Sequence, residues 1–444
     1  MKLELTKLRT MNRSTLIQLF MMIGVSLLAQ RDTLSLDEAI TLALRQNPNI
    51  LIAANEKEIA QISDNWFAAG RIPTVALNGT YSRSLTNLNQ KLSNGTEIIR
   101  NGVSNGVINA NGQFSYRLYN GKRMYIVKKR LDIQAAQSDI ALKQQINQTS
   151  FDVINKYINI NSLVQRRKAI NETISFFEER SKLSQSRFEI GTAGKNDYLQ
   201  SQVDLNVQRS NALSLDNDIQ LAKMDLNRVM ARDPFMLYEV HDLNIPDVLP
   251  TKDQMQSAID SLNPDIAFIR YNQQILEQQN KEIKTQQLPS IFANASAAFN
   301  KSSSTAGFNL FTQNYGPQAG LTISMPLFTG PIVRQQLQIN AIQSKNQALQ
   351  IDNTKQALLT QAAIAYQNFE NAKSLIALEE KNLEVIRENN YISMERFRKA
   401  TITTVELRQA QLNLVEAQNR IINARYTLKE SETQIRYIMG ALVE

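Results

Sequence analysis

Apolar residues recur at helical spacing along most of the chain. The first such stretch opens with a Ser/Thr-type cap and carries apolar side chains at steps of three and four residues, so one amphipathic helix is predicted from Leu36 to about Ala69. Pro73 then ends helical structure, because proline lacks a backbone N–H donor and clashes with the preceding turn. After its N-terminal segment the chain is therefore predicted to begin with a helix.

Alternation of apolar residues with small or polar ones replaces the helical pattern in two places. It predicts two strand pairs, at residues 74–85 with 106–119 and at residues 290–300 with 317–328. Each strand has one apolar face, and aromatic residues, which favour a membrane–water boundary, stand near the strand ends. These aromatic residues are Tyr81, Tyr119, Phe299 and Phe328. The pattern matches membrane β-strands, although a half-buried soluble sheet would show the same alternation.

A long helical run follows each strand pair. Residues 121–187 and 330–396 continue for about 65 residues with no proline beyond Pro331, and at 1.5 Å per residue each run predicts a helix of roughly 100 Å. Returning helices are predicted at residues 197–231 and 406–439. One long soluble coiled coil would explain these helices equally well, but it would not explain the strand pairs.

The order of elements occurs twice. Asn47-Pro48 recurs 216 residues later as Asn263-Pro264, and Asn120-Gly121 recurs 209 residues later as Thr329-Gly330. The difference of seven residues therefore falls within the strand pair, where a loop of variable length is expected. The predicted organisation is a first repeat at 30–231, a linker at 232–254 and a second repeat at 255–444.

Residues 1–29 are predicted to be a signal peptide. A basic stretch ends at Arg13, an apolar run extends from Leu16 to Leu28, and Ala29 precedes a plausible cleavage point. Met11 could equally serve as the start, since the sequence from Met11 retains both regions. An N-terminal membrane anchor is the alternative, but the apolar run is shorter than the roughly 20 residues that span a bilayer.

Composition excludes several kinds of chemistry. The chain has no Cys and a single His, His241, so neither thiolate metal sites nor a Ser–His pair of the usual kind is expected, and His241 is predicted to have a packing or surface role. The formal charge of +8 over 444 residues is too small and dispersed for nucleic-acid binding. No phosphate-binding loop or catalytic constellation is visible. We therefore predict a non-enzymatic protein without a cofactor or metal.

Four membrane strands in one chain cannot close on themselves. An open sheet in lipid would leave two edges whose unpaired N–H and C=O groups each cost several kcal/mol, and single-chain bacterial barrels begin at eight strands. Several copies must therefore share one barrel, and three copies would supply twelve strands. The expected fold is mainly α-helical with a membrane β-barrel part.

The sequence resembles the TolC family of outer-membrane efflux proteins over essentially the whole mature chain. The resemblance rests on markers whose order, spacing and duplication fit the family. The markers are Leu34 to Ile40 with Asn47-Pro48, Tyr119-Asn120-Gly121, Leu327-Phe328-Thr329-Gly330, and Arg187-Phe188-Glu189-Ile190-Gly191-Thr192. It implies a homotrimer whose twelve-stranded barrel in outer-membrane lipid continues into a twelve-helix periplasmic tunnel.

The resemblance also implies partners and a gate. The channel would receive substrate through a periplasmic adaptor from an inner-membrane pump of the RND or ABC type. Asp197 and Glu406 match acids that line the periplasmic entrance in the family, while Gln409 stands where a second acid often lies. Residues at the ends of the long helices are candidates for latches, which would hold the helical tips closed. Residues in the turns are candidates for contact with the adaptor. The latch candidates are Arg187 and Arg396, and the adaptor-contact candidates are Gly191, Thr192, Ala400 and Thr401.

Asp197 and Glu406 can be explained either as a ring of charges that lines the pore or as acids that stabilise the start of a helix. Three copies of each acid around a narrow passage would favour cations, but an acid in the first turn of a helix is also stabilised by the helix dipole. The predicted function is an outer-membrane exit duct of a tripartite efflux or type I secretion system that conducts passively. A periplasmic coiled-coil adaptor without a membrane barrel is the alternative.

Overall fold

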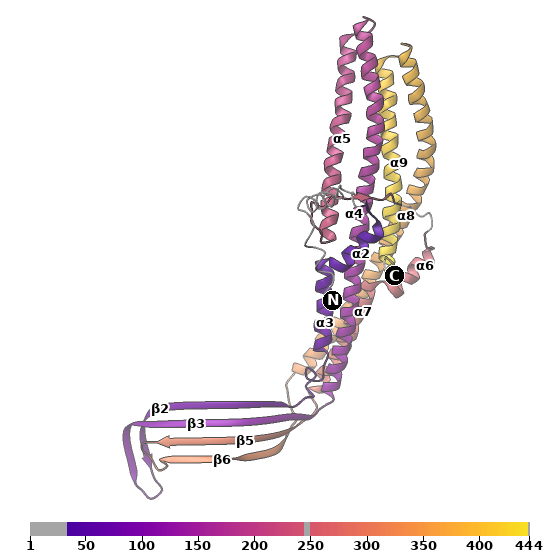
Figure 1. The fold of residues 1–444 in the computed structure, drawn as a ribbon. Coiled ribbons are helices and arrows are strands. Elements are labelled where there is room, and N and C mark those ends of the chain that lie inside the picture. The colour runs from indigo at the N-terminus through magenta and orange to yellow at the C-terminus, as the bar shows by residue number, and fades with distance from the viewer. Residues whose placement is uncertain (1–32, 244–248, 443–444) are drawn as a thin grey trace, which may run out of the picture. The chain divides into compact units, whose positions relative to one another are not determined.

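The computed structural model describes residues 33–243 and 249–442. The predicted signal peptide lies outside these residues. Two short strands, four long strands and eight helices follow one another along the described chain (Figure 1). They are β1 Thr33–Leu34, α2 Leu36–Gln46, α3 Pro48–Ser63, β2 Thr74–Lys91, β3 Glu97–Asn120, α4 Arg123–Glu189, α5 Lys195–Val229, β4 Glu239–Val240, α6 Lys252–Leu262, α7 Pro264–Thr285, β5 Ser290–Ser304, β6 Phe311–Ser324, α8 Ile332–Arg398 and α9 Thr404–Met439.

The second half repeats the elements of the first. Helices α2 and α6 have 11 residues each, α4 and α8 have 67 each, and α5 and α9 have 35 and 36. The order helix, helix, strand pair, long helix, returning helix occurs in both halves. The second copy starts at α6, whose first residue, Lys252, falls within the range predicted as linker.

The helix predicted from Leu36 to Ala69 is not continuous, and that prediction was wrong. Asn47 has an extended backbone, with φ −63° and ψ 122°, and separates α2 from α3. The reason is Pro48, since the residue before a proline avoids the helical region. Asn47 Nδ2 donates to Val229 O at 2.7 Å, and Asn263 Nδ2 donates to Ile438 O at 2.7 Å in the second repeat. In each repeat, the Asn side chain of the Asn-Pro pair is thus hydrogen-bonded to the end of the returning helix.

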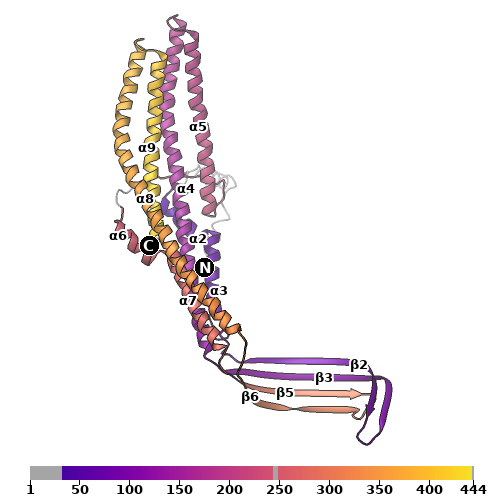
Figure 2. The same ribbon diagram turned by 180° about the vertical axis from the view of Figure 1, so that it is seen from behind.

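Contacts divide the chain into two compact units. In the first unit, whose described residues are 33–52, 144–243, 249–263 and 357–442, helices α5, α4, α9 and α8 lie side by side in that order (Figures 1 and 2). One face of this layer is covered by α2, α6 and the parallel pair β1–β4. The helical layer thus has one covered face and one open face.

The core beneath α2 is organised around a buried tyrosine. The Tyr157 hydroxyl lies 2.8 Å from Leu34 O and 3.0 Å from His241 O, so the two carbonyl groups share its one proton, and burial raises its pKa to about 12. Leu226 and Met230 complete the same cluster. The predicted linker contains a short strand here, because Glu239–Val240 pairs with β1, and the backbone of His241 contributes to this core.

The second unit, residues 53–143 and 264–356, contains a four-stranded antiparallel sheet in the order β2-β3-β5-β6. Its first hairpin is longer than the predicted strands at 74–85 and 106–119, because β2 continues to Lys91 and β3 starts at Glu97. The extensions lack a regular alternation, because polar and charged residues interrupt the apolar ones and the register shifts between Thr86 and Leu88. Strand β6 spans residues 311–324 rather than 317–328.

The register gives the sheet two contrasting faces. On one face, rows such as Val75–Phe114–Ala295–Ala319 and Leu77–Gly112–Ala297–Pro317 cross all four strands. On the other face, Asn109 Nδ2 donates to Thr80 Oγ1 at 3.2 Å, and Ser115 Oγ donates to Asn294 Oδ1 at 3.0 Å. One face is therefore apolar and the other is an amide and hydroxyl network. Among the described helices, none combines the length and apolar character needed to cross a bilayer.

Candidate gate at the helical tips

Two turns connect the long helices to their returning partners, and both are closed in the same way. Thr192 donates to Arg187 O through its N–H at 2.8 Å and through its hydroxyl at 3.2 Å. Thr401 donates to Arg396 O through its N–H at 2.9 Å and through its hydroxyl at 3.0 Å. These bonds satisfy carbonyl groups that the last helical turn leaves without partners. The two tips are thus copies of one cap.

The caps differ in the residue that adopts the left-handed conformation. Gly191 has φ +78° and Ala400 has φ +59°. This region costs an L-residue with a Cβ roughly 1–2 kcal/mol relative to glycine. A Cβ added at Gly191 would meet no atom within 4 Å, so the backbone conformation alone would oppose it. The second tip is therefore the more strained of the two.

Exchanging the two residues should move the stabilities of the tips in opposite directions. We expect Ala400→Gly to stabilise its tip by about 0.5 kcal/mol, once the greater freedom of unfolded glycine is subtracted, and Gly191→Ala to destabilise its tip by about 1 kcal/mol. Hydrogen exchange of the Thr401 and Thr192 amides reports each cap separately, because both amides donate within the caps. Faster Thr401 exchange in Ala400→Gly would contradict this account.

The two predicted entrance acids occupy different environments. Glu406 belongs to a capping box, in which Thr403 N donates to Glu406 Oε2 at 2.7 Å and Glu406 N donates to Thr403 Oγ1 at 3.2 Å. The backbone hydrogen bond from Thr403 is the main reason that the pKa of Glu406 lies below its ordinary value. Asp197 lies in the first turn of α5 behind Gly194, which provides no side-chain cap. Capping therefore engages the Glu406 carboxylate, while the Asp197 carboxylate has no hydrogen-bond or ion-pair partner within the described residues.

The two arginines at the ends of the long helices also differ. The Arg187 guanidinium lies 4.1 Å from the centre of the Phe397 ring and donates to the carbonyl oxygen of Phe397. Phe397 is fully buried near the end of α8, so Arg187 connects the two repeats. Arg396 is exposed and lowers the pKa of Glu406 only weakly, through its charge. Of the two latch candidates, Arg187 makes the contact between hairpins.

A buried charge network below the tips escaped the sequence analysis. Arg180 on α4 is fully buried and forms an ion pair with Asp204 on α5, and its Nη1 donates to Gln411 Oε1 on α9 at 3.0 Å. Arg408 Nε approaches Asp204 Oδ2 at 3.1 Å. Desolvation lowers the pKa of Arg180, and the carboxylate of Asp204 opposes that shift. One carboxylate thus holds two guanidinium groups from opposite hairpins.

This network lies nine residues from the ends of α4 and α5, or about 14 Å along the helices. Charged residues in polar helices ordinarily face water, so nothing in the local pattern marked Arg180 as buried. The repeat contained a usable signal, because Asn389 and Asn413 stand 209 residues after Arg180 and Asp204. The charge pair is therefore specific to the first repeat.

Paired helical hairpins joined to long strands with one apolar face define the class of outer-membrane export channels. The sequence model described as "Outer membrane efflux protein" matches residues 39–232 and 256–441, and the chain belongs to this family. It is an outer-membrane exit duct for efflux or secretion. The family is one of transport channels rather than enzymes, so the predicted resemblance is confirmed and the coiled-coil adaptor is set aside.

Individual proteins show the same relationship. The outer membrane protein TolC of Salmonella enteritidis is 21% identical over 437 residues, covering 95% of this chain and 84% of TolC. The alkaline protease secretion protein AprF of Pseudomonas aeruginosa is 20% identical and covers 95% of this chain and 88% of AprF. The crystal structure of the outer membrane protein VceC from Vibrio cholerae has a TM-score of 0.76 at 17% identity, covering 91% of this chain and 96% of VceC.

Proposed function

We propose that three copies of this chain form one channel, with a shared twelve-stranded barrel and a periplasmic tunnel of twelve helices. The unpaired edges of the sheet are the observation that carries this proposal. Strands β2 and β6 end the sheet order and have no further partner among the described residues. In lipid, each unpaired backbone group would cost several kcal/mol, so β2 of one copy must pair with β6 of the next.

The helical layer supports the same arrangement. Helices α5 and α8 form its two edges (Figure 1), and each carries exposed aliphatic side chains at helical spacing. On α5 these are Leu199, Val203, Val207 and Leu221, and on α8 they are Leu378, Val385 and Ile392. Such stripes are typical of helices that pack side by side. The α5 edge of one copy would therefore cover the α8 edge of the next.

Cargo would enter at the helical tips from an adaptor and an inner-membrane pump of the RND or ABC class. The exposed turns at Gly191, Thr192, Ala400 and Thr401 provide the adaptor contact in this proposal. AprF, by its name, serves protease secretion, which supports secreted polypeptides as well as small molecules as cargo. The chain itself would conduct passively, with energy supplied by the pump.

Reconstitution of the purified protein in planar bilayers tests this function. We expect discrete conductance that favours cations, and a weaker cation preference after Asp197→Asn, because three negative charges leave the entrance. Glu406→Gln should change selectivity less, since capping already engages that carboxylate. Purified protein that stays monomeric, or that never conducts even with Asp197 and Glu406 both replaced by Ala, would refute the proposal.

A further inference from the structure

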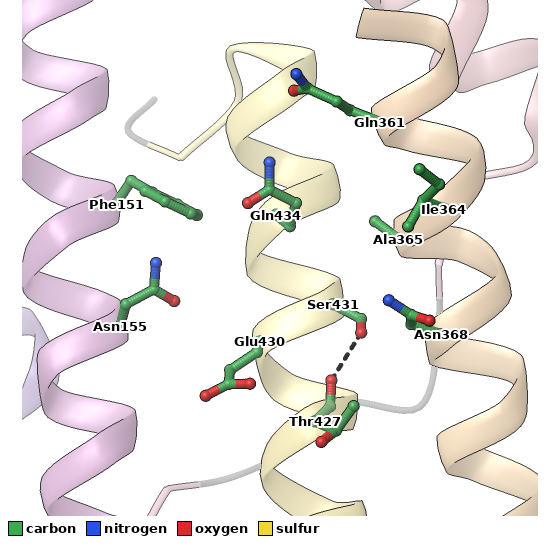
Figure 3. Close-up of a pocket in the computed structure, with 10 residues that line it drawn as sticks. All are labelled: Phe151, Asn155, Gln361, Ile364, Ala365, Asn368, Thr427, Glu430, Ser431 and Gln434. Carbon is green, nitrogen blue, oxygen red and sulfur yellow. Dashed lines mark hydrogen bonds between the residues drawn. The ribbon is translucent and has the colours of Figure 1, made fainter.

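The helical unit contains a groove of about 450 Å³ between α4, α8 and α9 (Figure 3). Its lining combines apolar groups, side-chain amides and one carboxylate. The residues that matter for its chemistry are Phe151, Asn155, Ile364, Asn368, Glu430 and Gln434. The groove lies within one copy of the chain, away from the tips where the gate candidates are found.

The groove opens on the face of the helical layer that α2 and α6 leave uncovered. On α4, Val153 packs in the cluster beneath α2, and Asn155 lies two residues, or 200°, farther around the helix. On α9, Leu428 packs on the covered side with Leu249, and Glu430 again lies two residues beyond it. In the proposed trimer, α2, α6 and the β1–β4 pair would lie on the outside of the ring of helices. The groove, on the opposite face, would then line the tunnel interior.

Glu430 is the one charged side chain in the lining. Within the described residues its carboxylate has no hydrogen-bond or ion-pair partner, whereas the neighbouring Glu432 pairs with Lys429 at 2.8 Å and with Arg436 at 2.9 Å. Lys429 and Arg436 are thus paired with Glu432, on the other side of α9 from Glu430. The side chain of Glu430 remains exposed to water, and partial desolvation beside the groove walls raises the pKa of its carboxyl above the ordinary value. A cation entering the groove would relieve an uncompensated charge.

The apolar and amide groups restrict the kind of cation that fits. Phe151 and Ile364 offer hydrocarbon surface, while Asn155 on α4, Asn368 on α8 and Gln434 on α9 add neutral polar groups to the lining (Figure 3). Amide oxygens could join the carboxylate as ligands of a metal ion, but the groove supplies a single negative charge and no second acid, His or Cys to offset a divalent ion. An organic cation with an apolar body satisfies both kinds of surface, because its charge meets Glu430 and its body covers the apolar walls.

We propose that this groove is a binding site for amphipathic organic cations on the tunnel wall, with Glu430 as the counter-charge. The proposal deepens the exit-duct function and rests on the trimeric channel for the placement of the groove inside the tunnel. Each copy contributes one complete site. Passing cations would be held transiently at three equivalent positions.

Equilibrium binding of ethidium to the purified full-length protein, followed by fluorescence anisotropy, tests the site. Glu430→Gln should weaken binding about tenfold, because a charge-assisted contact is lost. Ile364→Ala should weaken it less, since Ile364 is 57% exposed and forms only part of the wall. Glu416→Gln is the matched control, because it removes the same charge from α9 outside the groove.

Unchanged affinity in Glu430→Gln, or an equal loss in Glu416→Gln, would overturn the proposal. A change of oligomeric state in Glu430→Gln, measured by sedimentation, would also overturn it, because the carboxylate would then hold a contact between copies. Conductance separates the two levels of inference. If the protein conducts but its ethidium affinity is the same with and without Glu430, the binding site is refuted and the channel is not. If ethidium binding depends on Glu430 but the protein never conducts, the proposed channel function is refuted.

Discussion

Replacement of Asp204 by Ala is expected to destabilise the helical hairpins by about 3–5 kcal/mol, the usual cost of leaving a buried charge without its partner. Arg180 is fully buried, and Asp204 also neutralises Arg408, so the substitution leaves two guanidinium groups facing each other. Guanidinium chloride unfolding followed by circular dichroism measures the loss of stability. Faster hydrogen exchange in α4, α5 and α9 would locate it near the tips.

A second substitution distinguishes charge from packing. Arg180→Met in the Asp204→Ala background should recover a large part of the loss, because an apolar side chain of similar length needs no counter-charge. Arg209→Ala is the control, since it breaks an ion pair of 2.8 Å with Glu178 in which both side chains are well exposed. Such pairs contribute about 0–1 kcal/mol. Equal losses of unfolding free energy in Asp204→Ala and Arg209→Ala would show that the buried network contributes no more stability than an exposed ion pair.

The second large effect is expected in the sheet. Ala297→Arg should destabilise the membrane-inserted protein by about 2–4 kcal/mol per copy, because Ala297 lies at the middle of β5 on the apolar face and an arginine there would enter the lipid. Reversible unfolding in lipid vesicles, or the yield of folded protein after insertion, measures the effect. The small neighbours Gly112 and Pro317 leave space for the new side chain, so a steric clash would not explain the loss.

The adjacent residue provides the control. Ser296 pairs with Gln113 and Gln318 on the polar face, which faces water in the proposed barrel. Ser296→Arg therefore introduces the same side chain into the same strand at little cost. Equal destabilisation by the two substitutions would contradict the assignment of the faces, and the reverse order would mean that the apolar face is turned away from lipid.

The sequence was sufficient for the features that depend on local periodicity. Helical spacing predicted the long and returning helices, and alternation located both strand pairs. The duplicated Asn-Pro and Gly markers placed these elements in two repeats, and together they supported the family. Such patterns are readable because a helix or strand repeats its inward face every few residues, whatever it packs against.

The contacts between distant side chains became known only from the packing of the helices. This packing placed Asn47 and Asn263 against the ends of returning helices, paired Arg180 with Asp204, and engaged Glu406 in a cap while leaving Asp197 free of one. These contacts join residues from separate helices, and their partners depend on how each helix is rotated about its axis. Local spacing fixes which face of a helix is apolar, but the neighbour that this face meets is determined by packing.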